Sequence, residues 1–134
     1  AIISVSASDE VRDMASNYSI PTNKKIRGRN GLVLGEGWDN ITGGTSGTNT
    51  LDFAPYMGMP ELIPTSQNYR NYWTGSENNG SLHSNSCTGW TSNASGVSGR
   101  QAEPYDYTFN YPRYFLSYGN SACNYPKRLL CVCY

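Results

Sequence analysis

Apolar side chains recur with the period of a helix near the N-terminus of the chain. The stripe consists of Val11, Met14, Ala15 and Tyr18, at positions i, i+3, i+4 and i+7. Ser6 or Ser8 can cap the start of this helix through its hydroxyl group. The pair Ile20-Pro21 ends the helix, because a residue that precedes proline avoids the helical conformation. The pattern therefore predicts one amphipathic helix before residue 21.

Shorter apolar runs follow the predicted helix. They predict two strands, around Lys25–Ile26 and at Leu32–Leu34. Between residues 36 and 41 the spacing predicts a single helical turn, with Trp38 and Ile41 facing the core. Gly, Thr and Ser dominate the next residues, up to Asn49, and predict a flexible loop.

Turn-forming residues and short β-prone runs alternate in the rest of the chain. Prolines interrupt residues 51–65 repeatedly, which predicts ordered but irregular coil. Four runs predict strands: Tyr72–Ser76, Gly89–Ser92, Tyr114–Ser117 and Arg128–Tyr134. The tripeptide Asn78-Asn79-Gly80 predicts a turn after the first of them. One or two early helices and several late strands indicate an α+β domain.

Length and charge narrow the possible partners. A chain of 134 residues forms one domain, so we assign residues 1–134 to a single unit. Ten basic and ten acidic side chains cancel, which argues against nucleic acid as a partner. No apolar run approaches the roughly 20 residues that span a bilayer, so we expect no direct membrane span. Because the chain starts at Ala1 and not at Met, we expect a processed protein or the C-terminal part of a longer surface protein.

Three motifs in the second half of the chain resemble a known family. They are Trp73-Thr-Gly-Ser, Cys87-Thr-Gly-Trp-Thr-Ser, and the terminal Arg128-Leu-Leu-Cys-Val-Cys-Tyr preceded by Cys123. Together they resemble the endostatin-like branch of the C-type-lectin-like domains, which includes bacterial secreted proteins and lipoproteins. The resemblance implies one or two short helices, small antiparallel sheets and long ordered loops. It also implies a domain that binds a ligand, because this fold class rarely catalyses.

The same resemblance implies a disulfide between Cys87 and Cys123. The family's second bridge joins the cysteine matching Cys131 to one near the N-terminus, and this chain has no cysteine before Cys87. Either the partner lay upstream, or Cys131 is a buried free thiol; Cys133 is unpaired by the same analogy. Both would point to one face of a strand, an awkward geometry for bonding to each other. This cysteine usage favours an extracellular or bacterial cell-surface location.

Catalytic and metal-binding motifs are missing from the sequence. The single histidine, His83, has no evident acidic partner, and no spacing singles out two carboxylates for glycoside hydrolysis. His83 and Cys87 have ligand-like spacing, but a disulfide at Cys87 would remove that pair. Glu103-Pro104 is followed by Tyr105, which breaks the calcium-site pattern of C-type lectins. We therefore expect a protein that is not an enzyme, with no cofactor and no metal ion.

Tyrosine, asparagine and serine gather in two regions and indicate a binding surface. Rigid aromatic rings mixed with adaptable hydrogen-bonding groups are typical of such surfaces. The candidate ligand-binding residues are Tyr69, Arg70, Tyr72, Asn78, Asn79, His83, Asn85, Tyr105, Tyr107, Asn110, Tyr111, Arg113 and Tyr114. We expect a non-catalytic extracellular module that uses them to bind a protein or glycan on another surface. The alternative interpretation is an ordinary polar loop surface.

Three narrower hypotheses follow from the resemblance and the composition. The Tyr/Asn/Ser density near the C-terminus is similar to that of variable proteins of diversity-generating retroelements, whose display surface is hypervariable. Endostatin-type domains suggest instead calcium-independent binding of sulfated polysaccharide, through basic residues such as Lys24, Lys25, Arg27 and Arg29. A third hypothesis is an oligomerising head domain of a surface protein. The oligomeric state stays open.

Overall fold

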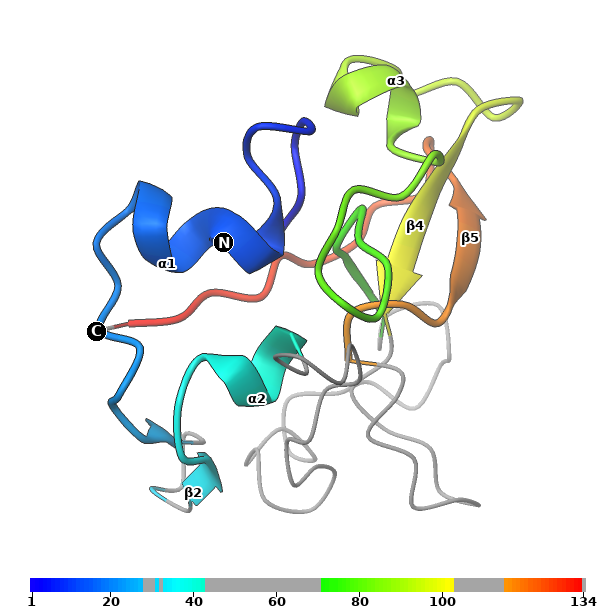
Figure 1. Ribbon diagram of the computed structural model, residues 1–134. Coiled ribbons are helices and arrows are strands. Elements are labelled where there is room, and N and C mark those ends of the chain that lie inside the picture. The colour runs from blue at the N-terminus through cyan, green and yellow to red at the C-terminus, as the bar shows by residue number, and fades with distance from the viewer. Residues whose placement is uncertain (28–30, 32, 43–70, 103–114, 134) are drawn as a thin grey trace.

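A computed structural model gives the fold of the chain (Figure 1). It describes residues 1–27, 31, 33–42, 71–102 and 115–133. In this part the protein has a small α+β fold with three short α-helices, a three-stranded antiparallel sheet, one disulfide and long irregular connections. The N-terminal residues and α1 lie on one side of the sheet, and the C-terminal segment runs from the sheet back toward α1.

The first helix is shorter than predicted. It begins as a 3₁₀ turn, η1 (Val11–Asp13), and continues as α1 (Met14–Asn17). Val11 and Met14 are buried as the stripe predicted, whereas Tyr18 lies beyond the helix and is 50% exposed. The capping prediction was wrong. The hydroxyls of Ser6 and Ser8 hydrogen-bond to each other, and the Oγ of Ser4 accepts from the backbone N–H of Val11 instead.

The elements predicted after the first helix are present. Strand β1 (Ile26–Arg27) pairs antiparallel with β2 (Val33–Gly35). Helix α2 (Asp39–Thr42) is a single turn, and Trp38 and Ile41 are both buried, as their spacing predicted. Residues 43–65, predicted as loop and coil, lie outside the described residues.

The main sheet contains β3 (Tyr72–Trp73), β4 (Ser98–Ala102) and β5 (Gly119–Ala122), in the order β3-β4-β5. Only β3 was predicted, and it is shorter than the predicted run to Ser76. It stops because the next backbone N–H groups, of Thr74 and Gly75, both turn toward one carbonyl, that of Arg100. The sequences of β4 and β5 are rich in Ser, Gly and Ala, which gave no strand signal.

Three other strand predictions were wrong. The run Gly89–Ser92 overlaps a helical turn, α3 (Cys87–Trp90), in which Thr88 and Gly89 have positive φ and the Ser86 hydroxyl accepts from the Gly89 N–H. The described part of Tyr114–Ser117 is a turn, and the described residues of Arg128–Tyr134 form no strand, only one bridge between Tyr72 and Arg128.

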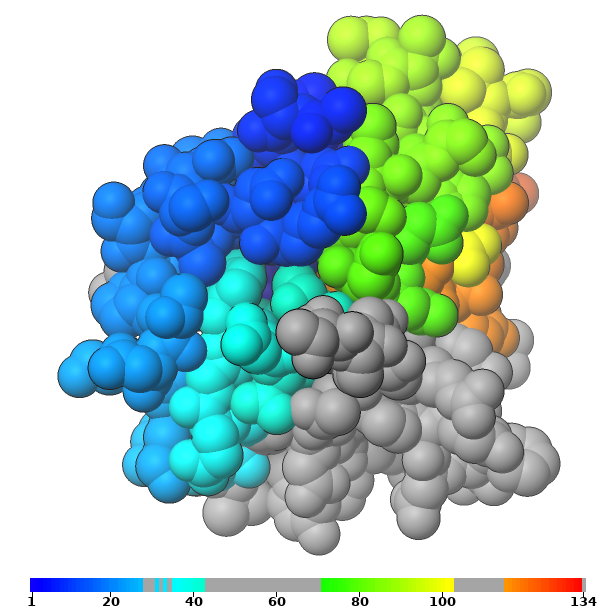
Figure 2. Space-filling view, viewed as in Figure 1, coloured from blue at the N-terminus to red at the C-terminus, as the bar shows by residue number. Residues whose placement is uncertain are grey.

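One apolar core joins the N-terminal residues to the sheet. It contains Ile2, Val11, Met14, Ile20, Trp38, Ile41, Tyr72, Ala102, Phe115 and Leu116. Figure 2 shows the corresponding contact at the surface, where the N-terminal residues lie directly against residues from the β3–α3 region. Burial of apolar area stabilises the fold, and it requires both halves of the chain at once.

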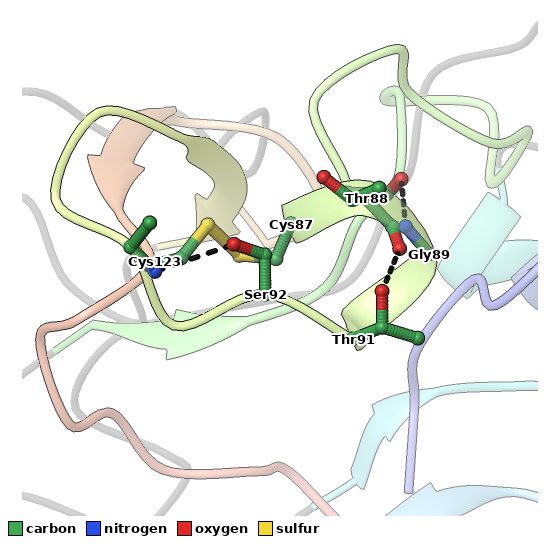
Figure 3. Close-up of a disulfide and its surroundings, with 8 residues drawn as sticks. Cys87, Thr88, Gly89, Thr91, Ser92 and Cys123 are labelled. Carbon is green, nitrogen blue, oxygen red and sulfur yellow. Dashed lines mark hydrogen bonds between the residues drawn. A yellow bond between two sulfur atoms is a disulfide. The ribbon is translucent and has the colours of Figure 1, made fainter.

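The predicted disulfide between Cys87 and Cys123 is confirmed (Figure 3). It joins the start of α3 to the residue after β5, across 36 residues of chain. Cys131 and Cys133 are free, and both are exposed, so the alternative of a buried thiol at Cys131 is wrong. No helix in the described residues is long and apolar enough to cross a membrane.

Candidate functional site

The polar loop, residues Glu77–Asn85, is the part of the predicted binding surface that the structure describes. It follows β3 and precedes α3, and an antiparallel bridge between Ser76 and Leu82 encloses the turn at its tip, residues 77–81. The predicted turn at its tip is confirmed, with Gly80 at φ +81° and its N–H donating to the carbonyl of Glu77. Such a φ favours glycine, so the tip has the residue it needs. Asn79 is exposed at this tip, while Asn78, His83 and Asn85 are partly exposed.

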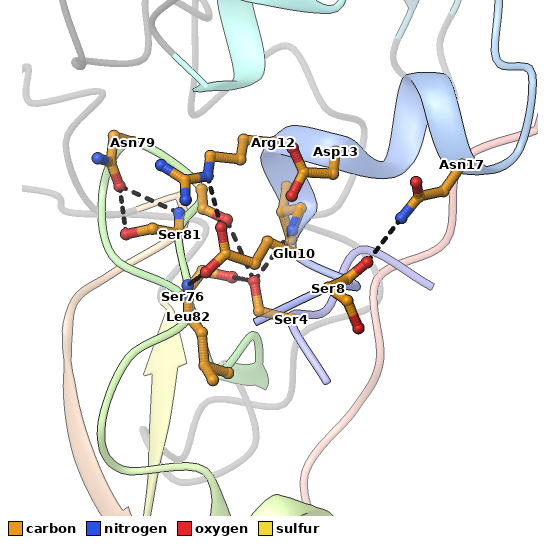
Figure 4. A network of polar contacts seen from close by, with 12 residues as sticks. Ser4, Ser8, Glu10, Arg12, Asp13, Asn17, Ser76, Asn79, Ser81 and Leu82 are labelled. Atoms are coloured by element: carbon orange, nitrogen blue, oxygen red, sulfur yellow. Dashed lines mark hydrogen bonds and ion pairs between the residues drawn. The ribbon is translucent and has the colours of Figure 1, made fainter. Parts of the chain in front are cut away.

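A buried carboxylate, that of Glu10, connects the polar loop to the first helix (Figure 4). Glu10 is 5% exposed, and its Oε1 accepts from the backbone N–H of Leu82 at 2.8 Å. Its Oε2 lies 2.5 Å from the Nε of Arg12. Oε1 is therefore satisfied by a hydrogen bond, whereas Oε2 has an ion-pair partner but no hydrogen bond among the described residues. The carboxylate fixes one side of the loop from a position 72 residues away.

Ser4 makes a second connection between the N-terminal residues and the loop. Its Oγ is fully buried, 2.9 Å from the Oγ of Ser76 and 3.2 Å from the carbonyl of Gly80. The same carbonyl accepts from the backbone N–H of Arg12. The tip of the loop is thus held through its backbone, and the side chains at the tip are not needed for that purpose.

His83 organises the loop from inside. Its Nδ1 accepts from the backbone N–H of Asn85 at 2.9 Å, so the neutral ring carries its proton on Nε2. That Nε2 lies 3.6 Å from Oε1 of Glu77. Burial lowers the pKa of His83 below 6.5, and Arg100 acts in the same direction, while Glu77 opposes both. At neutral pH the ring is therefore uncharged.

Arg100 joins the end of the loop to the sheet. Its backbone N–H donates to the carbonyl of Asn85 at 2.8 Å. Its side chain crosses to the neighbouring segment, where Nε donates to the Oγ of Ser117 and Nη1 donates to Oδ1 of Asn120. Both of these guanidinium partners belong to β5 or to the segment that leads into it, so Arg100 fixes the loop's position on β4.

Two tryptophan side chains, Trp73 and Trp90, pack together near the disulfide, next to the polar loop. Trp73 and Trp90 pack edge to face, with ring centroids 5.8 Å apart. The Nζ of Lys127 lies 5.3 Å from the Trp73 ring, and burial lowers its pKa. Trp90 donates its indole N–H to the carbonyl of Ser4 at 2.9 Å. The Trp90 ring thus contacts the N-terminal segment, and the Trp73 ring lies beside the disulfide.

The structure separates the predicted site residues into three groups. Asn78, Asn79, His83 and Asn85 lie together in the polar loop. Tyr72 lies in the core: it is 3% exposed, donates its hydroxyl to the carbonyl of Phe115, and has a pKa raised by burial. It therefore supports the sheet and does not offer its ring to a ligand. Outside the described residues lie Tyr69, Arg70, Tyr105, Tyr107, Asn110, Tyr111, Arg113 and Tyr114.

The basic residues proposed for sulfate binding have contacts of their own. Lys25 pairs with Glu36 at 2.9 Å, and Arg27 donates to the carbonyl of Gly31. Lys24 is exposed, and Arg29 lies outside the described residues. A sulfate site needs cations that converge on one point. The described residues give no such convergence.

Sequence analysis did not assign Ser4 or Glu10 to the site. Both precede the first helix, where Glu10 is an ordinary residue for an acidic first turn. The residues around Glu10 in the sequence do not indicate a partner 72 residues away. Only the packing of the N-terminal residues against the loop brings these groups together.

The chain has no recognisable relative in three kinds of comparison: no family model, no curated protein and no solved structure matches it. Within the residues that the structure describes, no group of three or more His, Cys, Asp or Glu side chains could hold a metal ion. The resemblance to C-type-lectin-like domains rests on the motifs quoted above.

Proposed function

We propose that this chain is a non-catalytic, extracellular ligand-binding module of the C-type-lectin-like kind, and that the polar loop forms part of its ligand surface. One observation supports this most: the backbone of the loop is held by buried groups on several sides, while Asn79 at its tip is exposed. A loop with this arrangement is positioned before a ligand arrives.

Prior positioning matters because binding otherwise has to order the loop. Immobilising flexible side chains and backbone reduces affinity, and a loop that is already ordered avoids most of that loss. Asparagine and serine then provide donors and acceptors that adapt to different partners. Asn79 has this character, since its Oδ1 accepts from both the N–H and the hydroxyl of Ser81. Its amide NH₂ is the group left to face a ligand.

The proposal also includes the tyrosine-rich residues 105–114, where the aromatic part of the surface would lie. If the chain is a variable protein of a diversity-generating retroelement, these residues would carry most of the variation. The disulfide between Cys87 and Cys123 is consistent with the extracellular location that this function needs. Binding of sulfated polysaccharide is the weaker alternative, because no described observation favours it.

The test is to select ligands and then change one atom of the loop. Immobilised protein is screened against a phage-displayed peptide library and on an array of glycans and glycosaminoglycans, with and without a calcium chelator. Each ligand found is measured again with Asn79→Asp. This variant keeps the oxygen that Ser81 needs and replaces the exposed NH₂ with a charged oxygen. We expect the affinity to fall by a factor of about ten or more, which is about 1.4 kcal/mol. We also expect binding to be the same with and without the calcium chelator.

Asn93→Asp is the matched control, because Asn93 is exposed in the connection between α3 and β4 and gives the same change of charge. It should bind as the original chain does. Equal affinity of all three proteins for every selected ligand would contradict a ligand surface on the polar loop. A screen in which no ligand is selected by either method would contradict the binding function itself.

A further inference from the structure

The C-terminal edge, residues Leu129–Cys133, alternates between packed and exposed side chains. Leu130 and Val132 pack against the core, whereas Leu129 is 54% exposed and Cys131 and Cys133 are also exposed. This period of two is that of an extended segment with one face on the core. The outward face therefore shows a leucine and two free thiols in one row.

The backbone of the C-terminal edge is bonded on one side. The carbonyl of Arg128 accepts from the N–H of Trp73, and that of Leu130 accepts from the N–H of Ile2. In an extended segment the groups of odd-numbered residues point to the opposite side. Among the described residues, no backbone hydrogen bond reaches Cys131 or Cys133. Within the residues that the structure describes, this side of the segment is an open edge, a site where another extended chain can pair.

The two thiols cannot bond to each other in this conformation. Side chains two residues apart on an extended segment point the same way, about 6.5 Å apart. A disulfide needs Cβ atoms at about 3.5–4.5 Å. Bending the segment to meet that limit would pull Leu130 and Val132 out of their contacts with the core. The other pair, Cys87 and Cys123, is already bonded.

We propose that Cys131 and Cys133 form an intermolecular disulfide site, and that its partner is the C-terminal edge of a second copy of this chain. Two copies related by a twofold axis meet antiparallel, so each presents the same row to the other. Facing residues of antiparallel strands have Cα atoms about 4.5–5.5 Å apart, within the range of about 4.4–6.8 Å for a disulfide. A thiol needs another thiol as its partner, and Leu129 supplies apolar contact on the same row.

The bond forms by thiol–disulfide exchange with a small disulfide such as glutathione disulfide. A thiolate of one copy attacks that disulfide, which gives a mixed disulfide and releases one glutathione thiolate. A thiolate of the second copy then attacks the protein sulfur and releases the other glutathione. The two protein thiols lose two protons and two electrons in total, and glutathione disulfide gains them as two thiols.

The experiment incubates the 134-residue chain with oxidised and reduced glutathione and follows the mass on non-reducing gels and by light scattering. We expect a disulfide-linked dimer, and peptide mapping should find the cross-link at Cys131 or Cys133. The double variant Cys131→Ser/Cys133→Ser should give at least tenfold less dimer. A monomer whose two thiols stay free, or become bonded to each other, would overturn the proposal, as would a dimer that persists in the double variant.

Leu129→Lys distinguishes pairing at the edge from random oxidation. This variant keeps both thiols but places a charge on the exposed row, which disfavours edge pairing. Its dimer should form several-fold more slowly at the same thiol concentration. Lys127→Arg serves as the control, because it retains the charge beside Trp73 and should leave the rate unchanged. Equal rates of dimer formation for Leu129→Lys and the original chain would contradict the proposed pairing at this edge.

Discussion

Two neighbouring regions hold distant parts of this chain together by different means. At the polar loop, buried groups of Ser4 and Glu10 reach residues more than seventy positions later through hydrogen bonds. In the second region, the bond between Cys87 and Cys123 is covalent and lies beside Trp73. The hydrogen bonds of the first region depend on the orientation of their donors and acceptors and on the presence of both partners. The second region depends on redox conditions.

The difference concerns which state each contact acts on. A disulfide stabilises chiefly by restricting the unfolded chain, so it contributes even where the folded contacts are modest. The buried carboxylate acts in the folded state, where losing one partner leaves a polar group without water or a hydrogen bond. The disulfide should therefore make the larger contribution to the free energy of unfolding of the whole domain. The hydrogen bonds from Ser4 and Glu10 should mainly determine how well the polar loop is ordered.

The largest expected effect is loss of the disulfide. In the chain-entropy model, removing a bridge across 36 residues lowers the free energy of unfolding by about 4 kcal/mol. We expect this for Cys87→Ala/Cys123→Ala in urea unfolding monitored by tryptophan fluorescence. Cys131→Ser/Cys133→Ser, studied as a monomer, should change stability little. An unchanged midpoint for the first variant would mean that packing, and not the bridge, dominates this region.

Glu10→Ala should have the next largest effect, about 2–3 kcal/mol, because it removes a charged acceptor from the part-buried N–H of Leu82 and takes away the ion-pair partner of Arg12. Glu10→Gln keeps an acceptor and should lose less. Amide hydrogen exchange provides the sharper measurement: Leu82 should lose protection far more than residues of β4. Uniform loss of protection across the chain would contradict a local role for this carboxylate.

The smallest effect concerns His83 and pH. Burial lowers its pKa in the folded state below the ordinary 6.5, so the unfolded chain takes up the proton first as pH falls. The stabilising contribution is complete above 6.5, and it is lost as pH falls from that value through the lower pKa of the folded state. Urea midpoints measured from about pH 7.5 to 5.5 should fall more for the original chain than for His83→Gln, which keeps an acceptor for Asn85. Parallel curves would contradict this, since the chain has one histidine.

The sequence predicted the elements whose residues show a clear periodicity. Val11 and Met14 gave the first helix, and Trp38 and Ile41 gave the inward face of the α2 region. It failed for β4 and β5, because small residues there form strands through pairing with neighbours and not through their own preference. It also failed at Gly89, where positive φ values place a helical turn in an apparent strand.

The structural features of the candidate site were predicted in part for a similar reason. Composition located the polar loop, because Asn and Ser gather there, and the family resemblance supplied the disulfide. Composition could not separate a displayed tyrosine from a buried one, and Tyr72 lies in the core. Nor could it find Glu10, whose role arises only from tertiary packing. Burial depends on what the rest of the chain brings to a position.

The hydrogen bond from Ile2 to Leu130 joins the two ends of the described chain, and it has a consequence for synthesis. Leu130 is synthesised 128 residues after Ile2, so Ile2 stays exposed to water until residue 130 has been added. Contacts so distant in sequence slow folding and leave apolar surface open to aggregation meanwhile. A nascent chain from which residue 130 has not yet emerged therefore still exposes the side chain of Ile2.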